Sequence, residues 1–136
     1  MPAQAFDIIP LQTLTTSAIG GRLDVSGYKE LLVSLNITAI SGTAGAFEVY
    51  LESSDDSGVT WYEILADDIL KTGAAAPGQE LDSLRRDIAQ SAAIPAAGDK
   101  YVARYKTFGK DIRGRVVLTG GAAPNVTMAL KAVGKS

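Results

Sequence analysis

The residue types that perform acid–base and metal chemistry are scarce in this chain. Its 136 residues include no histidine and no cysteine, which removes the commonest general base, the commonest zinc ligand and any thiolate nucleophile. The carboxylate pairs Asp55-Asp56 and Asp67-Asp68 remain. General acid–base catalysis needs two carboxyl groups in one cleft with divergent pKa values, which sequence neighbours in a turn rarely supply. We therefore expect no catalytic residue, no cofactor and no enzyme.

Asp55 and Asp56 could instead offer oxygen atoms to a calcium ion. Calcium takes six to eight oxygen ligands, and the loop lacks the spacing of an EF-hand. The sequence therefore predicts solvated turn aspartates and no metal site.

Basic residues gather late in the chain and alternate with aromatic ones, a pattern that could bind phosphate and stack on bases. Residues 1–76 carry three basic and ten acidic groups, a net charge of −7, whereas residues 77–136 carry ten basic and five acidic groups, a net charge of +5. The acidic half would repel a nucleic acid, so we predict no nucleic-acid partner. The opposite charges of the two halves then have two interpretations. Neighbouring strands within one chain carry complementary charges, or copies of the chain attract one another head to tail. The basic segment contains Lys100, Arg104, Lys106, Lys110, Arg113 and Arg115, with Tyr101, Tyr105 and Phe108 between them.

The element that must position Asp55 and Asp56 is a predicted β-hairpin over residues 47–64, FEVYLESSDDSGVTWYEI. Alternate residues of a strand point to opposite faces. Phe47, Val49 and Leu51 therefore form a face for burial, and Glu48, Tyr50 and Glu52 form a polar one. Residues 53–58 hold the Ser, Asp and Gly that turns favour, with Gly58 free to take a positive φ.

Trp61 lies in the second arm of this hairpin and is our candidate core anchor. Its indole N–H then needs a partner, and a nearby backbone carbonyl is expected. The alternative is an exposed Trp61 on which a ligand stacks.

The remaining apolar patterns predict further strands. Residues 31–40 alternate Val33, Leu35, Ile37 and Ala39 with polar side chains, which indicates one buried face. Three more strands are expected at residues 101–108, 112–118 and 126–133, the last two joined as a hairpin through Gly120-Gly121-Ala122-Ala123-Pro124. Glu80 to Gln90 fits either a short helix or an irregular strand. Seven or eight short strands predict an all-β fold, an antiparallel β-sandwich or jelly roll.

Residues 1–16 are expected to form an N-terminal arm or an edge strand, and residues 17–136 a single β-sandwich domain. Pro10 interrupts the first segment and removes a ladder donor, which confines it to an edge. No apolar run approaches the roughly 18 residues of a membrane span, and the start lacks the pattern of a secretory signal. We expect neither a membrane partner nor secretion.

Four segments, in order, resemble small β-rich structural proteins of tailed bacteriophages. They are residues 31–40, the hairpin with Glu52-Ser53-Ser54-Asp55-Asp56-Ser57-Gly58-Val59-Thr60-Trp61, the Tyr101–Tyr105 strand, and the Gly-Gly-x-x-Pro turn into the final strand. They cover about half of the chain, and residues 65–98 depart from the pattern.

The resemblance implies a virion protein, most similar to head decoration, or cement, proteins that sit on the capsid surface, often as trimers. The implied partner is the major capsid protein, and assembly would occur in the host cytoplasm. A tail or adaptor component, and a carbohydrate- or surface-binding β-sandwich module, are the alternatives. The arm could supply the reach to the capsid, which makes candidate partner contacts of Phe6, Ile8, Ile9, Leu11 and Leu14.

Overall fold

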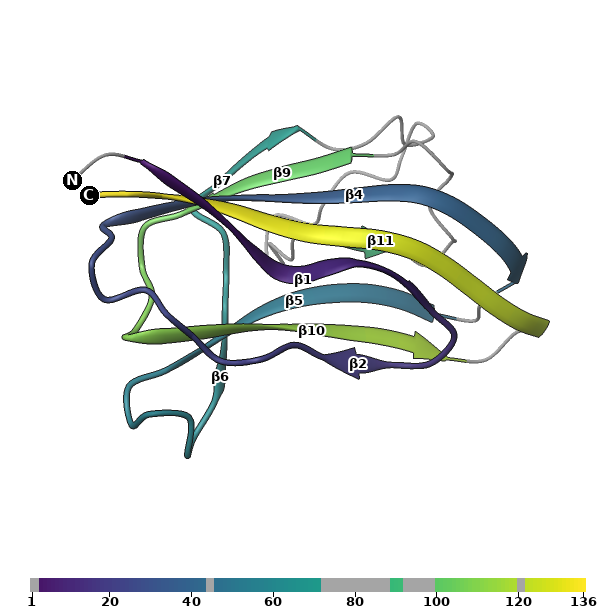
Figure 1. The fold of residues 1–136 in the computed structure, drawn as a ribbon, viewed down its shortest axis with the longest axis horizontal. Coiled ribbons are helices and arrows are strands. Elements are labelled where there is room, and N and C mark those ends of the chain that lie inside the picture. The colour runs from purple at the N-terminus through teal and green to yellow at the C-terminus, as the bar shows by residue number, and fades with distance from the viewer. Residues whose placement is uncertain (1–2, 44–45, 72–88, 92–99, 120–121) are drawn as a thin grey trace.

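The computed structural model describes residues 3–43, 46–71, 89–91, 100–119 and 122–136, and over these ranges the chain is all β (Figure 1). The strands are β1 (Gln4–Leu14), β2 (Ala18–Ile19), β3 (Leu23–Asp24), β4 (Glu30–Thr43), β5 (Ala46–Ser54), β6 (Tyr62–Ile64), β7 (Asp68–Lys71), β8 (Ala89–Ser91), β9 (Lys100–Tyr105), β10 (Asp111–Thr119) and β11 (Ala122–Lys135).

These strands form two antiparallel sheets. The first sheet has the order β1-β11-β4-β9-β7, and the second has the order β2-β10-β5-β6, with β3 also paired to β10 and β8 also paired to β5. Residues from both sheets share one apolar core, which includes Leu35 and Leu130 of the first sheet and Phe47 and Ile112 of the second. The predicted all-β, antiparallel sandwich is confirmed.

One predicted connection is wrong. The glycine-rich segment before Pro124 was expected to close a hairpin, but β10 belongs to the second sheet and β11 to the first. The chain therefore crosses from one layer to the other at this point, as it also does between β4 and β5. Turn residues alone do not distinguish a hairpin from a crossover, because both need a sharp change of direction.

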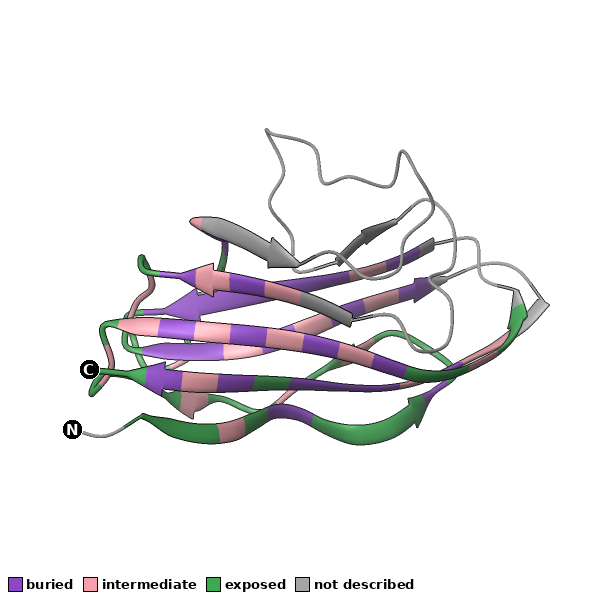
Figure 2. Ribbon diagram, turned by 90° about the horizontal axis from the view of Figure 1, so that it is seen from above, coloured by how far each residue is buried: buried purple, intermediate pink, exposed green. Residues whose placement is uncertain are grey.

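The core follows the predicted alternation along most of β4, seen in Figure 2 as bands of buried and half-buried residues on the long strands. Val33, Leu35 and Ile37 are buried, but Ala39 is exposed, contrary to its predicted inward position. The register of β4 against β11 shifts between Thr127 and Met128. A one-residue shift moves all later side chains to the opposite face.

The N-terminal segment is an edge strand, since β1 pairs with β11 along the first sheet. Register shifts on both sides of Ile9 interrupt this ladder, and Ile8 and Ile9 are both buried although they are sequence neighbours. Leu14 is buried as well, and Phe6 is half-buried and stacks on Tyr28 with ring centroids 5.9 Å apart.

Most of the predicted partner contacts are therefore core residues. Ile8, Ile9 and Leu14 are not available to a partner, because they fill the interior of the sandwich. Leu11 alone is largely exposed, at 62%. The predicted element over residues 80–90 lies mostly outside the described residues, and its last two residues belong to β8.

Candidate functional site

The outer face of the second sheet carries an interlocked set of charged and aromatic side chains. In the ladder between β5 and β10, Glu52 lies opposite Arg113 and Tyr50 lies opposite Arg115. Because every second residue of a strand points outward, Tyr50 and Glu52 share one face with both arginines. We call Tyr50, Glu52, Trp61, Arg113 and Arg115 the arginine–aromatic ladder.

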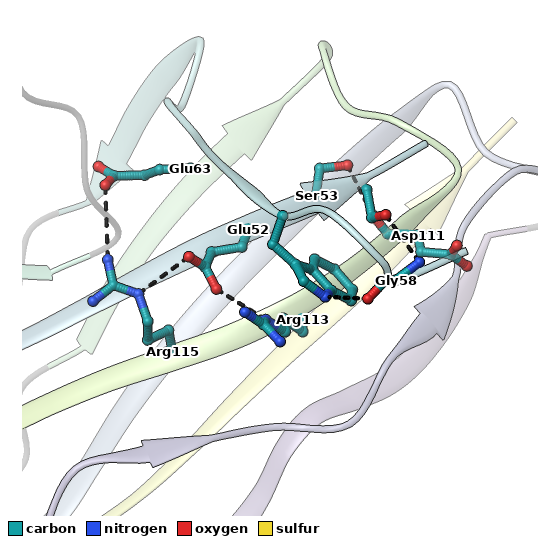
Figure 3. Close-up of polar contacts among 9 residues, drawn as sticks. Glu52, Ser53, Gly58, Glu63, Asp111, Arg113 and Arg115 are labelled. Carbon is teal, nitrogen blue, oxygen red and sulfur yellow. Dashed lines mark hydrogen bonds and ion pairs between the residues drawn. The ribbon is translucent and has the colours of Figure 1, made fainter. Parts of the chain in front are cut away.

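Glu52 joins the two arginines of this ladder (Figure 3). Its carboxylate accepts a hydrogen bond from Arg113 Nε at 2.9 Å and another from Arg115 Nε at 3.2 Å, one on each oxygen. Arg115 also makes a longer ion pair of 3.8 Å with Glu63 of β6. Charged hydrogen bonds of this kind are stronger than neutral ones, so Glu52 fixes the positions of both guanidinium groups.

Each arginine also lies over an aromatic ring. The guanidinium carbon of Arg113 is 4.3 Å from the centroid of Trp61, and that of Arg115 is 4.2 Å from the centroid of Tyr50. Both distances suit a cation–π contact. Arg115 thereby covers Tyr50, which is only 5% exposed and donates a hydrogen bond to Glu48. On the face that sequence alternation predicted to be polar, Tyr50 and Glu52 are therefore buried.

Trp61 is not the core anchor that the sequence predicted. It is half-buried and lies outside the core cluster, beside Arg113 on the outer face. Its indole N–H donates to the carbonyl of Gly58 at 2.9 Å, so the expected backbone partner is present. The indole ring lies against the turn of its own hairpin, where the bond to Gly58 and the contact with Arg113 hold it outside the core.

The turn of the predicted hairpin is confirmed and forms a loop, residues 55–61, which we call the tip loop. Leu51 pairs with Ile64 and Ser53 with Tyr62 across the hairpin. Ser57 and Gly58 both have positive φ, 61° and 90°, which glycine tolerates and serine rarely adopts. The two exposed aspartates of the prediction stand at the start of this loop.

Asp56 holds the tip loop from within. Its Oδ1 accepts hydrogen bonds from the Ser54 hydroxyl at 2.7 Å and from the Thr60 amide at 2.8 Å. The Ser54 hydroxyl in turn accepts the amide of Gly58 at 2.9 Å. These bonds stabilise the carboxylate form, first through Thr60 and then through Ser54, and lower the pKa of Asp56 to about 2.

Contacts from other segments clamp the same loop. Arg22, which precedes β3, donates to the carbonyl of Ser57. Asp55 accepts the Tyr62 hydroxyl at 2.9 Å and the Lys110 amide at 3.3 Å. At the base of the loop, the buried Ser53 hydroxyl donates to the carbonyl of Asp111 at 2.8 Å.

Three of the four carboxylates selected from the sequence make contacts that organise the backbone. Asp55 and Asp56 organise the tip loop, and Asp67 accepts the amide of Lys106 at 2.6 Å. Within the described ranges, no three His, Cys, Asp or Glu side chains gather closely enough to hold a metal ion. The same ranges contain no helix long and apolar enough to cross a membrane.

The three arginines of the predicted basic segment pair with acidic residues from the first half of the chain. Arg104 pairs with Glu30 at 3.5 Å, and Arg113 and Arg115 pair with Glu52. Of the two interpretations of the charge asymmetry, this supports complementary charges on neighbouring strands.

The sequence did not predict that the residues of the arginine–aromatic ladder come together. The sequence shows Arg113 and Arg115 with the spacing of one strand face, and Tyr50 and Glu52 with the same spacing. What it lacks is the register that sets these two pairs opposite one another.

Comparison with known proteins adds one similar structure. No protein-family model and no curated protein matches the chain. The crystal structure of the SPBc2 prophage-derived protein YomS is similar at a TM-score of 0.43 and 14% sequence identity, over 97% of this chain and 93% of that one. A likeness at this level establishes neither a common fold nor a common function, so the function is inferred below from the residues of this chain.

Proposed function

We propose that this chain is a non-enzymatic structural protein of a tailed-phage virion, a head decoration protein that binds the major capsid protein and stabilises the capsid surface. The hairpin, strand and turn motifs that resemble such proteins motivate the virion assignment. The arginine–aromatic ladder is the single observation that supports binding, and we assign the capsid contact to the outer face of the second sheet.

The ladder has the composition of a protein-binding surface. Trp, Tyr and Arg dominate the energetics of interfaces, because they present large contact areas together with directional hydrogen bonds. Here Trp61, Arg113 and Arg115 remain partly accessible, with the two arginine side chains 23% and 30% exposed. Their contacts with one another and with Glu52 fix the two arginines on β10 and Trp61 in the loop before β6, so little side-chain entropy is lost when a partner binds.

The N-terminal strand, by contrast, is a poor docking edge. Pro10 lacks an N–H, and the register shifts around Ile9 interrupt the ladder of β1. Prolines and bulges of this kind protect exposed edges from pairing with another chain. We therefore move the proposed capsid contact from the N-terminal segment to the arginine–aromatic ladder.

We further propose that the chain assembles as a homotrimer on the capsid. Several attachment points in one particle raise the effective concentration of each, so modest affinity per subunit gives durable attachment. The carbohydrate-binding alternative gains no support from the ladder, because Arg115 covers Tyr50 and Arg113 lies over Trp61.

Cosedimentation with phage heads tests this function. The probe is heads assembled from the major capsid protein encoded in the same genome, and we expect the purified chain to pellet with them and to raise their melting temperature. Binding to purified tails instead of heads would establish the tail or adaptor alternative, and binding to neither would refute a virion role.

A charge-reversal pair tests the face. Glu63→Arg alters the outer face of the second sheet at a side chain that is 37% exposed and makes a long ion pair with Arg115. Lys131→Glu alters the outer face of the first sheet at an exposed position. We expect Glu63→Arg to weaken head binding about tenfold, or about 1.4 kcal/mol, and Lys131→Glu to leave it unchanged. The reverse result would place the contact on the first sheet.

A further inference from the structure

A small pocket lies where the first residues of β1 meet β3. It has a volume of about 200 Å³ and is lined by Gln4, Phe6, Leu23, Asp24 and Tyr28. Pockets for drug-sized ligands are larger, about 300 to 1,000 Å³. This pocket therefore suits a single side chain, or a free molecule of that size.

The aromatic walls of the pocket are held in place by their neighbours. Phe6 stacks on Tyr28, and the Tyr28 hydroxyl donates to Gln4 Oε1 at 2.8 Å. The Tyr28 ring also lies against Gly134, where a β-carbon would come within 2.6 Å of the ring. Walls that are already ordered lose little conformational freedom when the pocket is filled.

The pocket contains two acceptor atoms with unused capacity. Asp24 Oδ1 accepts the Ser26 amide at 2.9 Å and the Ser26 hydroxyl at 2.6 Å, whereas Asp24 Oδ2 accepts no hydrogen bond from any residue that the structure describes. The bonds from Ser26 favour the carboxylate form and hold the pKa of Asp24 below its usual value. Gln4 Oε1 accepts one bond and has a second lone pair. An occupant must therefore supply donors, and a cation does so while also matching the carboxylate charge.

The basic residues nearest to Asp24 do not pair with it. The charges of Lys110 and Arg22 act on Asp24 more weakly than the Ser26 bonds do. Neither residue lines the pocket, and within the described ranges neither forms an ion pair with Asp24. Arg22 instead donates to the carbonyl of Ser57 in the tip loop. Among the described lining residues only Asp24 is charged, so a cation in the pocket would meet no charge of its own sign there.

The single unused carboxylate oxygen favours lysine over arginine as the occupant. A guanidinium fork binds a carboxylate through both oxygens, but Asp24 Oδ1 already holds two bonds from Ser26. An ammonium group is a compact point charge, for which one oxygen is enough. The four-carbon stem of a lysine can lie along apolar walls such as Phe6 and Leu23.

We propose that this pocket holds a lysine side chain of the major capsid protein, with the ammonium group on Asp24 Oδ2 and the stem against Phe6 and Leu23. The choice of partner rests on the proposed function, whereas the preference for lysine rests on the pocket itself. β3 pairs with β10, the strand that carries Arg113 and Arg115. The pocket therefore adjoins the proposed capsid contact on the second sheet.

Titration of the free chain with blocked amino acids tests the preference for lysine. The probes are the N-acetyl, N′-methylamide forms of lysine, of arginine, and of norleucine, which has the same four-carbon stem without the charge. The NMR shift of the Ser26 amide reports binding, because this amide donates to Asp24. We expect the lysine probe to saturate this shift and the other two to bind about fivefold more weakly or less. Equal binding of norleucine would refute recognition of charge, and tighter binding of arginine would refute lysine.

A pair of isosteric variants tests the site. Asp24→Asn removes the charge but keeps an oxygen for the two Ser26 bonds, and we expect it to bind the lysine probe about fivefold more weakly. Asp7→Asn is the matched control, because it removes the same charge from an exposed position of β1 that does not line the pocket. It should bind within about twofold of wild type. Equal affinities for the two variants would refute the site, and circular dichroism checks that both are folded.

Cosedimentation of the same variants with phage heads tests the partner. We expect Asp24→Asn to lose about fivefold in head affinity relative to Asp7→Asn. If the two bind heads equally, the capsid lysine is refuted and the decoration function stands. If wild type binds heads but not the lysine probe, the pocket is refuted and the function again stands. If wild type binds the lysine probe but no heads, the decoration function and the capsid partner are refuted together.

Discussion

At the scale of single residues, Asp55 and Asp56, which were considered as catalytic or calcium-binding carboxylates, instead accept hydrogen bonds from backbone amides. Asp56 accepts one hydroxyl and one amide hydrogen bond, and both depend on its carboxylate form. Its pKa of about 2 lies below the ordinary aspartate value of 3.8 because these bonds favour the charged state. Any stabilisation that Asp56 provides must therefore depend on pH.

The pH dependence has a definite direction. Since the folded pKa is the lower one, the contribution of Asp56 is fully present above 3.8 and is lost as the pH falls through about 2. We expect the stability difference between wild type and Asp56→Asn to narrow across this window, as measured by thermal unfolding. A carbon-detected NMR titration of the Asp56 carboxyl group should give a midpoint near 2, and a midpoint near 3.8 would show that the caps do not form in solution.

Trp61, Tyr50 and Glu52 show where residue-scale prediction from the sequence stops. The hairpin, its turn and the inward row of β5 follow from alternation and turn chemistry alone. The environment of the outward row does not, because it depends on Arg113 and Arg115, which are 61 and 63 residues away from Glu52 in the sequence. An aromatic residue beside an arginine need not enter the core, because the cation–π contact stabilises its ring at the surface.

At the scale of elements, β1 closes one side of the sandwich through a local irregularity. Ile8 and Ile9 both point into the core because the register of β1 shifts there, and they lie over Gly114 of β10. A side chain at Gly114 would meet them. Hydrophobic periodicity cannot reveal such a shift, since a bulge is visible only when two strands are paired.

Filling the space at Gly114 should destabilise the fold. A β-carbon there would lie 2.9 Å from Ile9 Cδ1 and 3.0 Å from both Ile8 Cγ2 and Leu130 Cδ2. We expect Gly114→Ala to cost about 1 to 3 kcal/mol, the usual range for overpacking a tight core, measured by urea unfolding. Gly21→Ala is the control, because nothing lies within 4 Å of its β-carbon position, and it should change stability by less than about 0.5 kcal/mol. Equal effects at both sites would mean that β1 does not pack on β10 in solution.

At the scale of the whole molecule, the opposite charges of the two halves of the sequence meet inside one chain. The ion pairs of Arg104, Arg113 and Arg115 each join a basic residue of the second half to Glu30, Glu52 or Glu63 of the first. The two-sheet topology makes this possible, since it pairs β4 with β9 and β5 with β10. The all-β class was predictable from local patterns, whereas these long-range pairings were not, because turn residues do not specify which strands become neighbours.

The internal pairing of charges leads to a prediction about assembly. Three arginines of the second half, Arg104, Arg113 and Arg115, are paired within one copy and are not available to attract another copy. We therefore expect the proposed homotrimer to be held by contacts other than long-range attraction between oppositely charged halves. We expect sedimentation equilibrium to give three times the mass of the chain, with no change between about 50 mM and about 500 mM NaCl, across which the Debye length falls from about 14 Å to about 4 Å. Dissociation at the higher salt concentration would restore the head-to-tail interpretation. A monomer at both concentrations would refute the trimer and leave each copy to bind the capsid through a single docking surface, in which case the avidity argument for durable attachment would no longer hold.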